Sequence, residues 1–159
     1  MIRKICLNIN VKIIILKFNT TYDIILYSNL IEMIFMFFKK KELFKVVICG
    51  CRDFQDYEFL KEKCLYYLQN KMPDVLIISG AASGADALGE RFAKEHHLKI
   101  ERHPADWDRY GKKAGPIRNE EMVQICDGVI AFWDGQSRGT KTTIDFCKQY
   151  NKRCIVVKI

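Results

Sequence analysis

Two glycine-bearing segments, each placed after an apolar run, carry the residue types best suited to chemistry. The first is Ser79-Gly-Ala-Ala-Ser-Gly-Ala-Asp86 and the second is Gly135-Gln-Ser-Arg-Gly-Thr-Lys-Thr142. Each leads from a predicted strand into a predicted helix, where backbone N–H groups lack partners and suit a phosphate. Two such turns in one small domain predict a cleft that holds a phosphorylated ligand from both sides.

The first segment lacks both the G-x-G-x-x-G spacing of a dinucleotide site and the lysine of a P-loop. Gly80 and Gly84 would let a ligand approach the backbone closely, so valine at Gly84 is expected to abolish binding and leave the fold intact. Ser79 and Ser83 would add hydroxyl donors. Asp86 either stabilises the helix N-terminus or accepts from a ribose. The alternative is a tight structural turn without a ligand.

The second segment has a superficial likeness to a P-loop, but one residue separates Gly139 from Lys141, which argues against an NTPase. The hydroxyls of Ser137 and Thr140 can cap the helix and, with backbone donors, hold phosphate. Arg138 adds a forked donor suited to oxyanions. The alternative is a helix cap with a solvated arginine.

Three further places offer candidate ligand contacts. Arg52 and Asp53 follow the first predicted strand; Asp53 could instead cap the next helix, whereas Arg52 has no evident structural partner. Trp107 lies in a stretch rich in aromatic and charged residues, and either stacks on a base or packs beneath its loop. Arg118 and Asn119 fall in the first turns of a helix and could face the cleft.

Charge and cysteine usage exclude several classes of function. Of the net charge of +7, residues 1–44 hold +4 and residues 45–159 hold +3, so nucleic acid is an unlikely partner. The seven cysteines are odd in number and form no C-x-x-C motif, which favours buried thiols in a cytoplasmic protein. We expect neither a metal ion nor a cofactor. A homo-oligomer is left open.

Residues 1–44 contain no Gly, Ala or Pro and differ in composition from the rest. The apolar run 24–38 is shorter than the ~20 residues that a membrane span needs and carries polar residues, so no membrane role is expected. No small-residue cleavage site marks a signal peptide. We favour a translation start further downstream, at Met33 or Met36, over an accessory β-hairpin or helix.

From residue 45 the chain alternates strand and helix patterns up to residue 159. Apolar runs predict strands over Phe44–Cys49, Val75–Ile78, Leu98–Arg102, Gly128–Phe132 and Arg153–Val157. Helices are predicted over Gln55–Asn70, Ala85–His96, Pro116–Ile125 and Thr140–Tyr150, and an irregular loop over Pro104–Lys112. This order predicts an α/β, Rossmann-like, doubly wound and mainly parallel sheet with helices on both faces and a ligand at its C-terminal edge.

Six short blocks, in order, resemble the YspA/YpsA-related branch of the SLOG superfamily over about residues 45–159. They are Gly-Cys-Arg-Asp-Phe (50–54), the segment 79–86, Pro-Ala-Asp-Trp (104–107), Gly-Pro-Ile-Arg-Asn (115–119), Ala-Phe-Trp-Asp-Gly (131–135) and Ser-Arg-Gly-Thr-Lys (137–141). The resemblance implies a Rossmann-like sheet and a nucleotide-derived ligand, and Asp134 joins the candidate ligand contacts.

The superfamily also contains phosphoribohydrolases, whose catalytic glutamate would fall on Thr143 here. Asp145, two helical positions further on, points about 200° away. The phosphate site is therefore expected to be present and the catalytic carboxylate absent, so no catalytic residue is assigned. We expect a protein that binds or senses a nucleotide or nucleotide-derived small molecule. The alternative is a phosphoribohydrolase-like enzyme, and single-stranded DNA binding comes third.

Overall fold

The computed structural model describes residues 4–7, 14–17 and 42–159. These residues divide into two units. One holds β1 (Lys4–Leu7) and β2 (Ile14–Lys17), which pair antiparallel, and the other is Glu42–Ile159. The downstream translation start falls outside the described residues and stays a prediction. Within the described ranges, no helix is both long enough and apolar enough to cross a bilayer.

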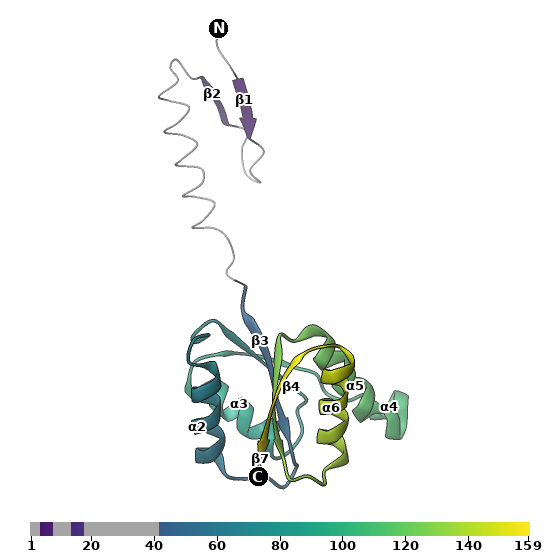
Figure 1. The fold of residues 1–159 in the computed structure, drawn as a ribbon. Helices are drawn as coiled ribbons and strands as arrows, with labels where there is room; N and C mark the ends of the chain where they lie inside the picture. Colours follow the sequence, from purple (N-terminus) through teal and green to yellow (C-terminus); the bar gives the residue numbers. More distant parts are fainter. Residues whose placement is uncertain (1–3, 8–13, 18–41) are drawn as a thin grey trace. The chain divides into compact units, whose positions relative to one another are not determined.

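The second unit is built on a five-stranded sheet in which every neighbouring pair is parallel. The strand order is β5-β4-β3-β6-β7, so the first strand of the domain is central and the chain winds outward from it in both directions. The strands are β3 (Phe44–Gly50), β4 (Val75–Ser79), β5 (Lys99–Arg102), β6 (Gly128–Trp133) and β7 (Arg153–Lys158). Their C-terminal ends share the lower edge of the sheet in Figure 1.

Helices cover both faces of this sheet, as the sequence predicts. Figure 1 shows α2 (Tyr57–Leu68) and α3 (Ala85–Glu95) on one side and α5 (Ala114–Ile125) and α6 (Arg138–Gln149) on the other. Two separate clusters of buried side chains, one on each face, hold the layers together. The fold is therefore a Rossmann-like, doubly wound α/β fold.

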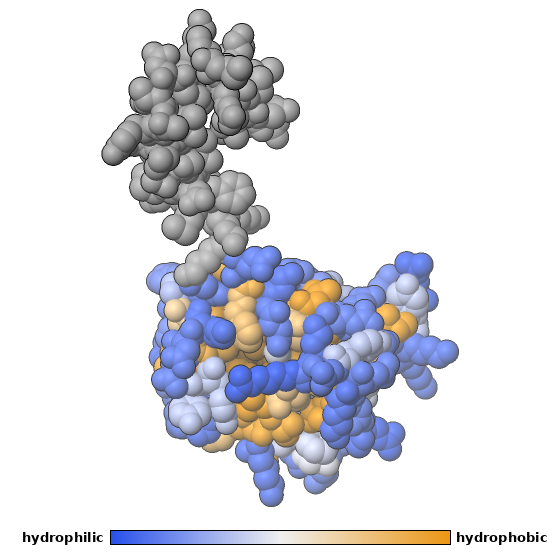
Figure 2. All heavy atoms as spheres, turned by 45° about the horizontal axis from the view of Figure 1, so that its top comes forward, coloured by the Kyte–Doolittle hydropathy of each residue, from blue (hydrophilic) through white to orange (hydrophobic). Residues whose placement is uncertain are grey.

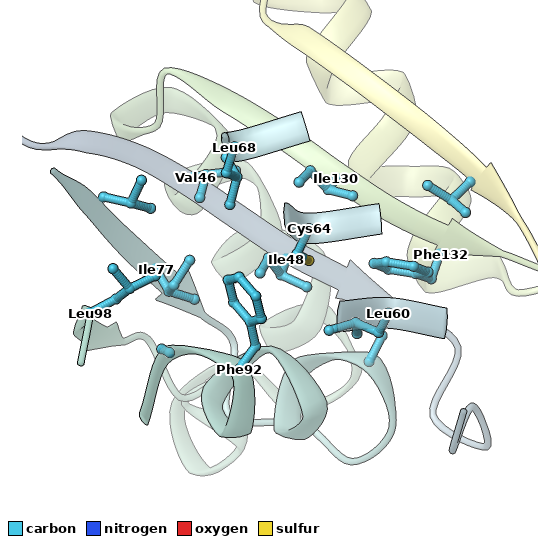
Figure 3. Packing of buried hydrophobic residues seen from close by; sticks show 14 of the residues in the cluster. Val46, Ile48, Leu60, Cys64, Leu68, Ile77, Phe92, Leu98, Ile130 and Phe132 are labelled. Carbon is cyan, nitrogen blue, oxygen red and sulfur yellow. The ribbon is translucent and has the colours of Figure 1, made fainter. Parts of the chain in front are cut away.

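The larger cluster forms because β3 and its neighbours are apolar on the face toward α2 and α3. Leu60 of α2 and Phe92 of α3 lie over Ile48 at the centre of this cluster, and all three are fully buried (Figure 3). Full burial of such a side chain contributes about 1.5–3 kcal/mol. The face of the domain seen in Figure 2 mixes hydrophilic and hydrophobic residues, and the exposed apolar side chains of the domain include Val156 and Ile159.

The structure differs from the sequence-based expectations at two helix starts. Asp56, not Asp53, caps α2, because its carboxylate accepts from the N–H of Phe59 at 3.0 Å. The stretch 104–112 is not an irregular loop: it contains α4 (Trp107–Tyr110) and the start of a 3-10 turn, η1 (Gly111–Lys113). Asp106 caps α4 by accepting from the N–H of Arg109 at 3.0 Å.

Candidate functional site

A cleft of about 590 Å³ opens at the C-terminal ends of β3 and β6. This is the point where the strand order reverses, because β4 lies on one side of β3 and β6 on the other. In open α/β sheets such a crevice is the usual ligand site. We call it the main cleft. It is lined by residues 49–53, Ala82, Asp86, Trp107, Gly115, Pro116, Arg118, Asn119, Met122, Asp134, 136–140, Thr142 and Thr143.

A second cavity of about 430 Å³, the side cavity, adjoins the main cleft. Four residues line both of them: Arg52, Ala82, Trp107 and Arg118. The remaining lining of the side cavity comes from the first glycine segment and the chain after β5, namely Gly80, Ala81, Ser83, Pro104 and Ala105. Both glycine segments therefore lie at the same edge of the sheet, as the sequence predicts.

The first glycine segment uses much of its hydrogen-bonding capacity within the protein. The N–H of Gly80 donates to Asp86 Oδ2 at 3.0 Å, and the N–H of Ala81 donates to Ser79 Oγ at 3.0 Å. The Ser79 hydroxyl in turn donates to Glu90 Oε1 at 2.9 Å. Ser79 is 1% exposed and lines neither cavity, so the structure gives it a role in the fold.

The glycines of this segment make room for the protein's own atoms. A Cβ on Gly80 would collide with the guanidinium of Arg118 and the carboxylate of Asp86. Gly84 has φ +72°, and its Cβ would collide with the backbone at Cys51 and Arg52. The expectation that valine at Gly84 leaves the fold intact is therefore wrong, because the positive φ and the close approach both require glycine.

Arg118 and Asp86 form the buried charged centre of the site, with 9% and 5% of their surfaces exposed. Nη1 of Arg118 donates to the carbonyl oxygen of Gly80, and to that of His103 at 3.4 Å. Burial raises the pKa of Asp86, and the nearby guanidinium of Arg118 opposes that shift. Burial likewise lowers the pKa of Arg118, and Asp86 opposes it. Each charge compensates the other inside the domain.

Asn119 links this centre to the second glycine segment. Its Oδ1 accepts from Nε of Arg118 at 2.9 Å, and its Nδ2 donates to the carbonyl oxygen of Gly139 at 3.3 Å. Both Arg118 and Asn119 line the main cleft. The two glycine segments are thus joined through the first turns of α5.

The second glycine segment keeps two backbone donors available. Asp134 Oδ1 accepts from the N–H groups of Gln136 and Ser137, both at 2.8 Å, and these bonds lower the pKa of Asp134. Ser137 caps α6 by accepting from the N–H of Thr140 at 3.5 Å. Among the hydrogen bonds of residues 42–159, none uses the N–H of Arg138 or Gly139. A Cβ on Gly139 would meet nothing within 4 Å.

Three exposed candidates sit around the mouth of the main cleft. Arg52 and Asp53 follow β3, and none of the hydrogen bonds within residues 42–159 involves their side chains. Trp107, at the start of α4, is 51% exposed and lines both cavities. Whether it stacks on a base stays a prediction.

Thr143 stands where the resemblance to the phosphoribohydrolases would place a catalytic glutamate, and it carries no charge. Thr143 is 1% exposed, lines the main cleft and donates its hydroxyl to the carbonyl oxygen of Gly139 at 3.3 Å. Asp145 instead forms an ion pair with Lys141 at 2.6 Å and does not line the cleft. Within the described residues, no group of three or more His, Cys, Asp or Glu side chains could hold a metal ion.

Sequence reasoning missed several lining residues, among them Cys51, Met122 and Gln136. Cys51 and Gln136 lie beside predicted contacts, directly after β3 and β6, so their position at strand ends is the signal that could have found them. Met122 reaches the cleft from one turn beyond Arg118 on α5. Its apolar side chain carries no pattern that separates a lining residue from a core residue.

The amino-acid sequence matches a known protein family and is similar to that of a phage protein. A model of the YspA, cpYpsA-related SLOG family matches residues 44–110. The Gene 61 protein of Mycobacterium phage D29 is 34% identical over 103 residues, an alignment that covers 61% of this chain and 82% of the phage protein.

Solved structures with the same fold are more distant. DNA processing protein A from Streptococcus pneumoniae superposes with a TM-score of 0.59 over 72% of this chain, at 19% identity; the chain spans half of that protein. TM1055 superposes with a TM-score of 0.53 over 70% of this chain and 72% of its own length, at 19% identity. DNA processing protein A from Helicobacter pylori superposes with a TM-score of 0.51 over 71% of this chain and 64% of its own length, also at 19% identity. The fold likeness agrees with the sequence match, and the chain belongs to the YspA, cpYpsA-related SLOG family.

Proposed function

We propose that the domain binds or senses a nucleotide or nucleotide-derived small molecule in the main cleft. The observation that carries this proposal is the start of α6, where the N–H groups of Arg138 and Gly139 have no hydrogen-bond acceptor within residues 42–159 and lie beside a cleft of about 590 Å³. The positive end of the helix dipole and two unpaired donors favour an anion such as phosphate. Arg52 and Arg118 line the same cleft and add positive charge.

Binding without turnover is supported by the chemistry of Thr143. Cleavage of an N-glycosidic bond passes through an oxocarbenium-like state that a carboxylate must stabilise. A buried threonine whose hydroxyl donates to Gly139 supplies no negative charge there. We therefore expect negligible release of free base from nucleoside monophosphates, and Thr143→Glu is the change most able to create some.

The experiment is mass spectrometry of small molecules that the purified protein retains, followed by calorimetric titration with the compound found. Gly139→Val should abolish binding with an unchanged melting temperature, because its side chain would project into open space that the ligand needs. Arg153→Ala is the matched control for Arg138→Ala, since Arg153 is also exposed but lies at the N-terminal end of β7. Equal affinity in wild type, Gly139→Val and Arg138→Ala would contradict the proposal.

A hydrolase is the second candidate, because three carboxylates line the main cleft: Asp53, Asp86 and Asp134. Burial raises the pKa of Asp86, while hydrogen bonds lower that of Asp134, and carboxylates with opposite shifts can divide acid and base roles. Wild-type release of base that disappears in Asp53→Asn or Asp86→Asn would put this candidate first.

A further inference from the structure

An apolar cavity of about 550 Å³ lies beside the main cleft, at the start of α2. Phe54, Phe59 and Ile159 supply its apolar lining. The cavity also contains Cys51, Asp53 and Asp134, and these three residues line the main cleft as well. A ligand could therefore extend from one cavity into the other past Asp53 and Asp134.

The aromatic lining is held in place by the core. The Phe54 ring stacks on the fully buried Phe132, with centroids 5.4 Å apart and planes 16° apart. Phe59 meets both rings edge-on, with centroids 6.5 Å from Phe54 and 6.4 Å from Phe132. Both Phe54 and Phe59 stay partly exposed. Rings that are already ordered offer a stacking surface with little further loss of side-chain entropy.

The main cleft and the apolar cavity are lined by different charges, and this difference would orient a bound ligand. The main cleft contains Arg52, Arg118 and Arg138, whereas the apolar cavity contains no Lys or Arg among its lining residues and is edged by Asp53, Asp56 and Asp134. A phosphate belongs with the arginines, and a second anionic group in the apolar cavity would be repelled. The part of the ligand that enters the apolar cavity must therefore be uncharged and largely apolar.

We infer that the ligand is a nucleoside monophosphate whose base occupies the apolar cavity formed by Phe54, Phe59 and Ile159, an inference that rests on the proposed phosphate site at α6. The phosphate lies at the start of α6 and the ribose passes Asp53. The Asp53 carboxylate, which accepts no hydrogen bond from the other residues of 42–159, accepts from the ribose hydroxyls. Base stacking on aromatic side chains tolerates any base, so the aromatic lining selects for a planar ring and leaves base identity to other contacts.

Calorimetric titration of the full chain with AMP, GMP, CMP, UMP and ribose 5-phosphate tests this inference. At least one nucleotide should bind tenfold or more tightly than ribose 5-phosphate, and Phe59→Ala should remove that difference. Tyr66→Ala is the matched control, because Tyr66 is an aromatic residue of the same helix that is 65% exposed and lies outside the cavity. It should leave the difference unchanged.

A measurement on the wild-type protein keeps the test independent of folding defects in Phe59→Ala. Saturation-transfer NMR with the tightest nucleotide should place the base protons, rather than the ribose protons, in closest contact with the protein. Equal affinity for nucleotides and ribose 5-phosphate, with both weakened by Arg138→Ala, would overturn the base site and leave the phosphate site standing. Failure of all five probes to bind at millimolar concentration would overturn the phosphate site as well.

Discussion

The two glycine segments look alike in sequence and differ in what fills them. In the first, Gly80 and Gly84 leave space that Arg118, Asp86 and the backbone after β3 occupy. In the second, Gly139 faces open space, and the N–H groups of Arg138 and Gly139 have no internal acceptor among the described residues. The same residue type thus makes room for the protein's own atoms at one place and borders open space at the other.

Substituting one glycine in each segment by alanine gives the largest expected difference in stability. Gly84→Ala forces a side chain into a positive-φ position, at about 1–3 kcal/mol of backbone strain. The collision with the backbone at Cys51 adds roughly 1–3 kcal/mol of overpacking. Gly139→Ala should change the free energy of unfolding by less than about 1 kcal/mol, since its Cβ meets nothing. Urea unfolding of both variants measures the contrast, and equal losses would remove the distinction between the segments.

Substitution of Arg118 should mainly lower stability, whereas substitution of Arg138 should mainly weaken ligand binding. Arg118→Ala leaves the buried carbonyl oxygen of Gly80 without its donor and Asp86 without its cationic neighbour, and an unsatisfied buried polar group costs about 1–3 kcal/mol. Arg138→Ala should leave stability within about 0.5 kcal/mol, because its side chain is exposed. It should instead weaken ligand binding by about 1.5–3 kcal/mol if its bond goes to a charged group. A stable Arg118→Ala protein would show that the charge centre does not support the fold.

The carboxylates of the two regions should respond to pH in opposite directions. The pKa of Asp134 is lowered by hydrogen bonds from Ser137 and Gln136, so its contribution to stability is present above the unfolded-state pKa and is lost as pH falls through the folded pKa. The pKa of Asp86 is raised by burial, so its contribution is present below the unfolded-state pKa and is lost as pH rises through the folded value.

Urea unfolding from pH 3 to pH 7 measures this smaller effect. Asp134→Asn should flatten the wild-type loss of stability toward acid. Asp86→Asn should reduce the loss of stability that Asp86 causes in the wild type as the pH rises from acid to neutral. Identical pH slopes for the wild type and both variants would mean that neither carboxylate is shifted by its surroundings.

Much of the fold could be predicted because local patterns determine it. Continuous apolar runs such as Val75–Ile78 identify the buried strands β3, β4 and β6, and the edge strands β5 and β7 also occur where they were predicted. The helix at Trp107 was missed because a single turn has no apolar stripe, and its formation depends on the cap at Asp106. Such a short element leaves little periodic signal in the sequence.

The place of the candidate site at one edge of the sheet was predicted, and its internal contacts were not. The position of the two segments at one sheet edge follows from the parallel topology. The place of Arg118 beside Gly80 does not, because 38 residues separate them and only tertiary packing brings them together. A glycine pattern alone therefore cannot distinguish space for a ligand from space for the protein's own side chain.

The most direct test of this account is an ¹⁵N-NMR titration of the full chain with the nucleoside monophosphate that binds best. The account predicts the largest amide shift changes at Arg138 and Gly139, which line the main cleft and whose N–H groups have no acceptor among the described residues, and small changes at Gly80 and Ala81, whose N–H groups donate to Asp86 and Ser79. Largest changes at Gly80 and Ala81, with none at Arg138 and Gly139, would contradict it.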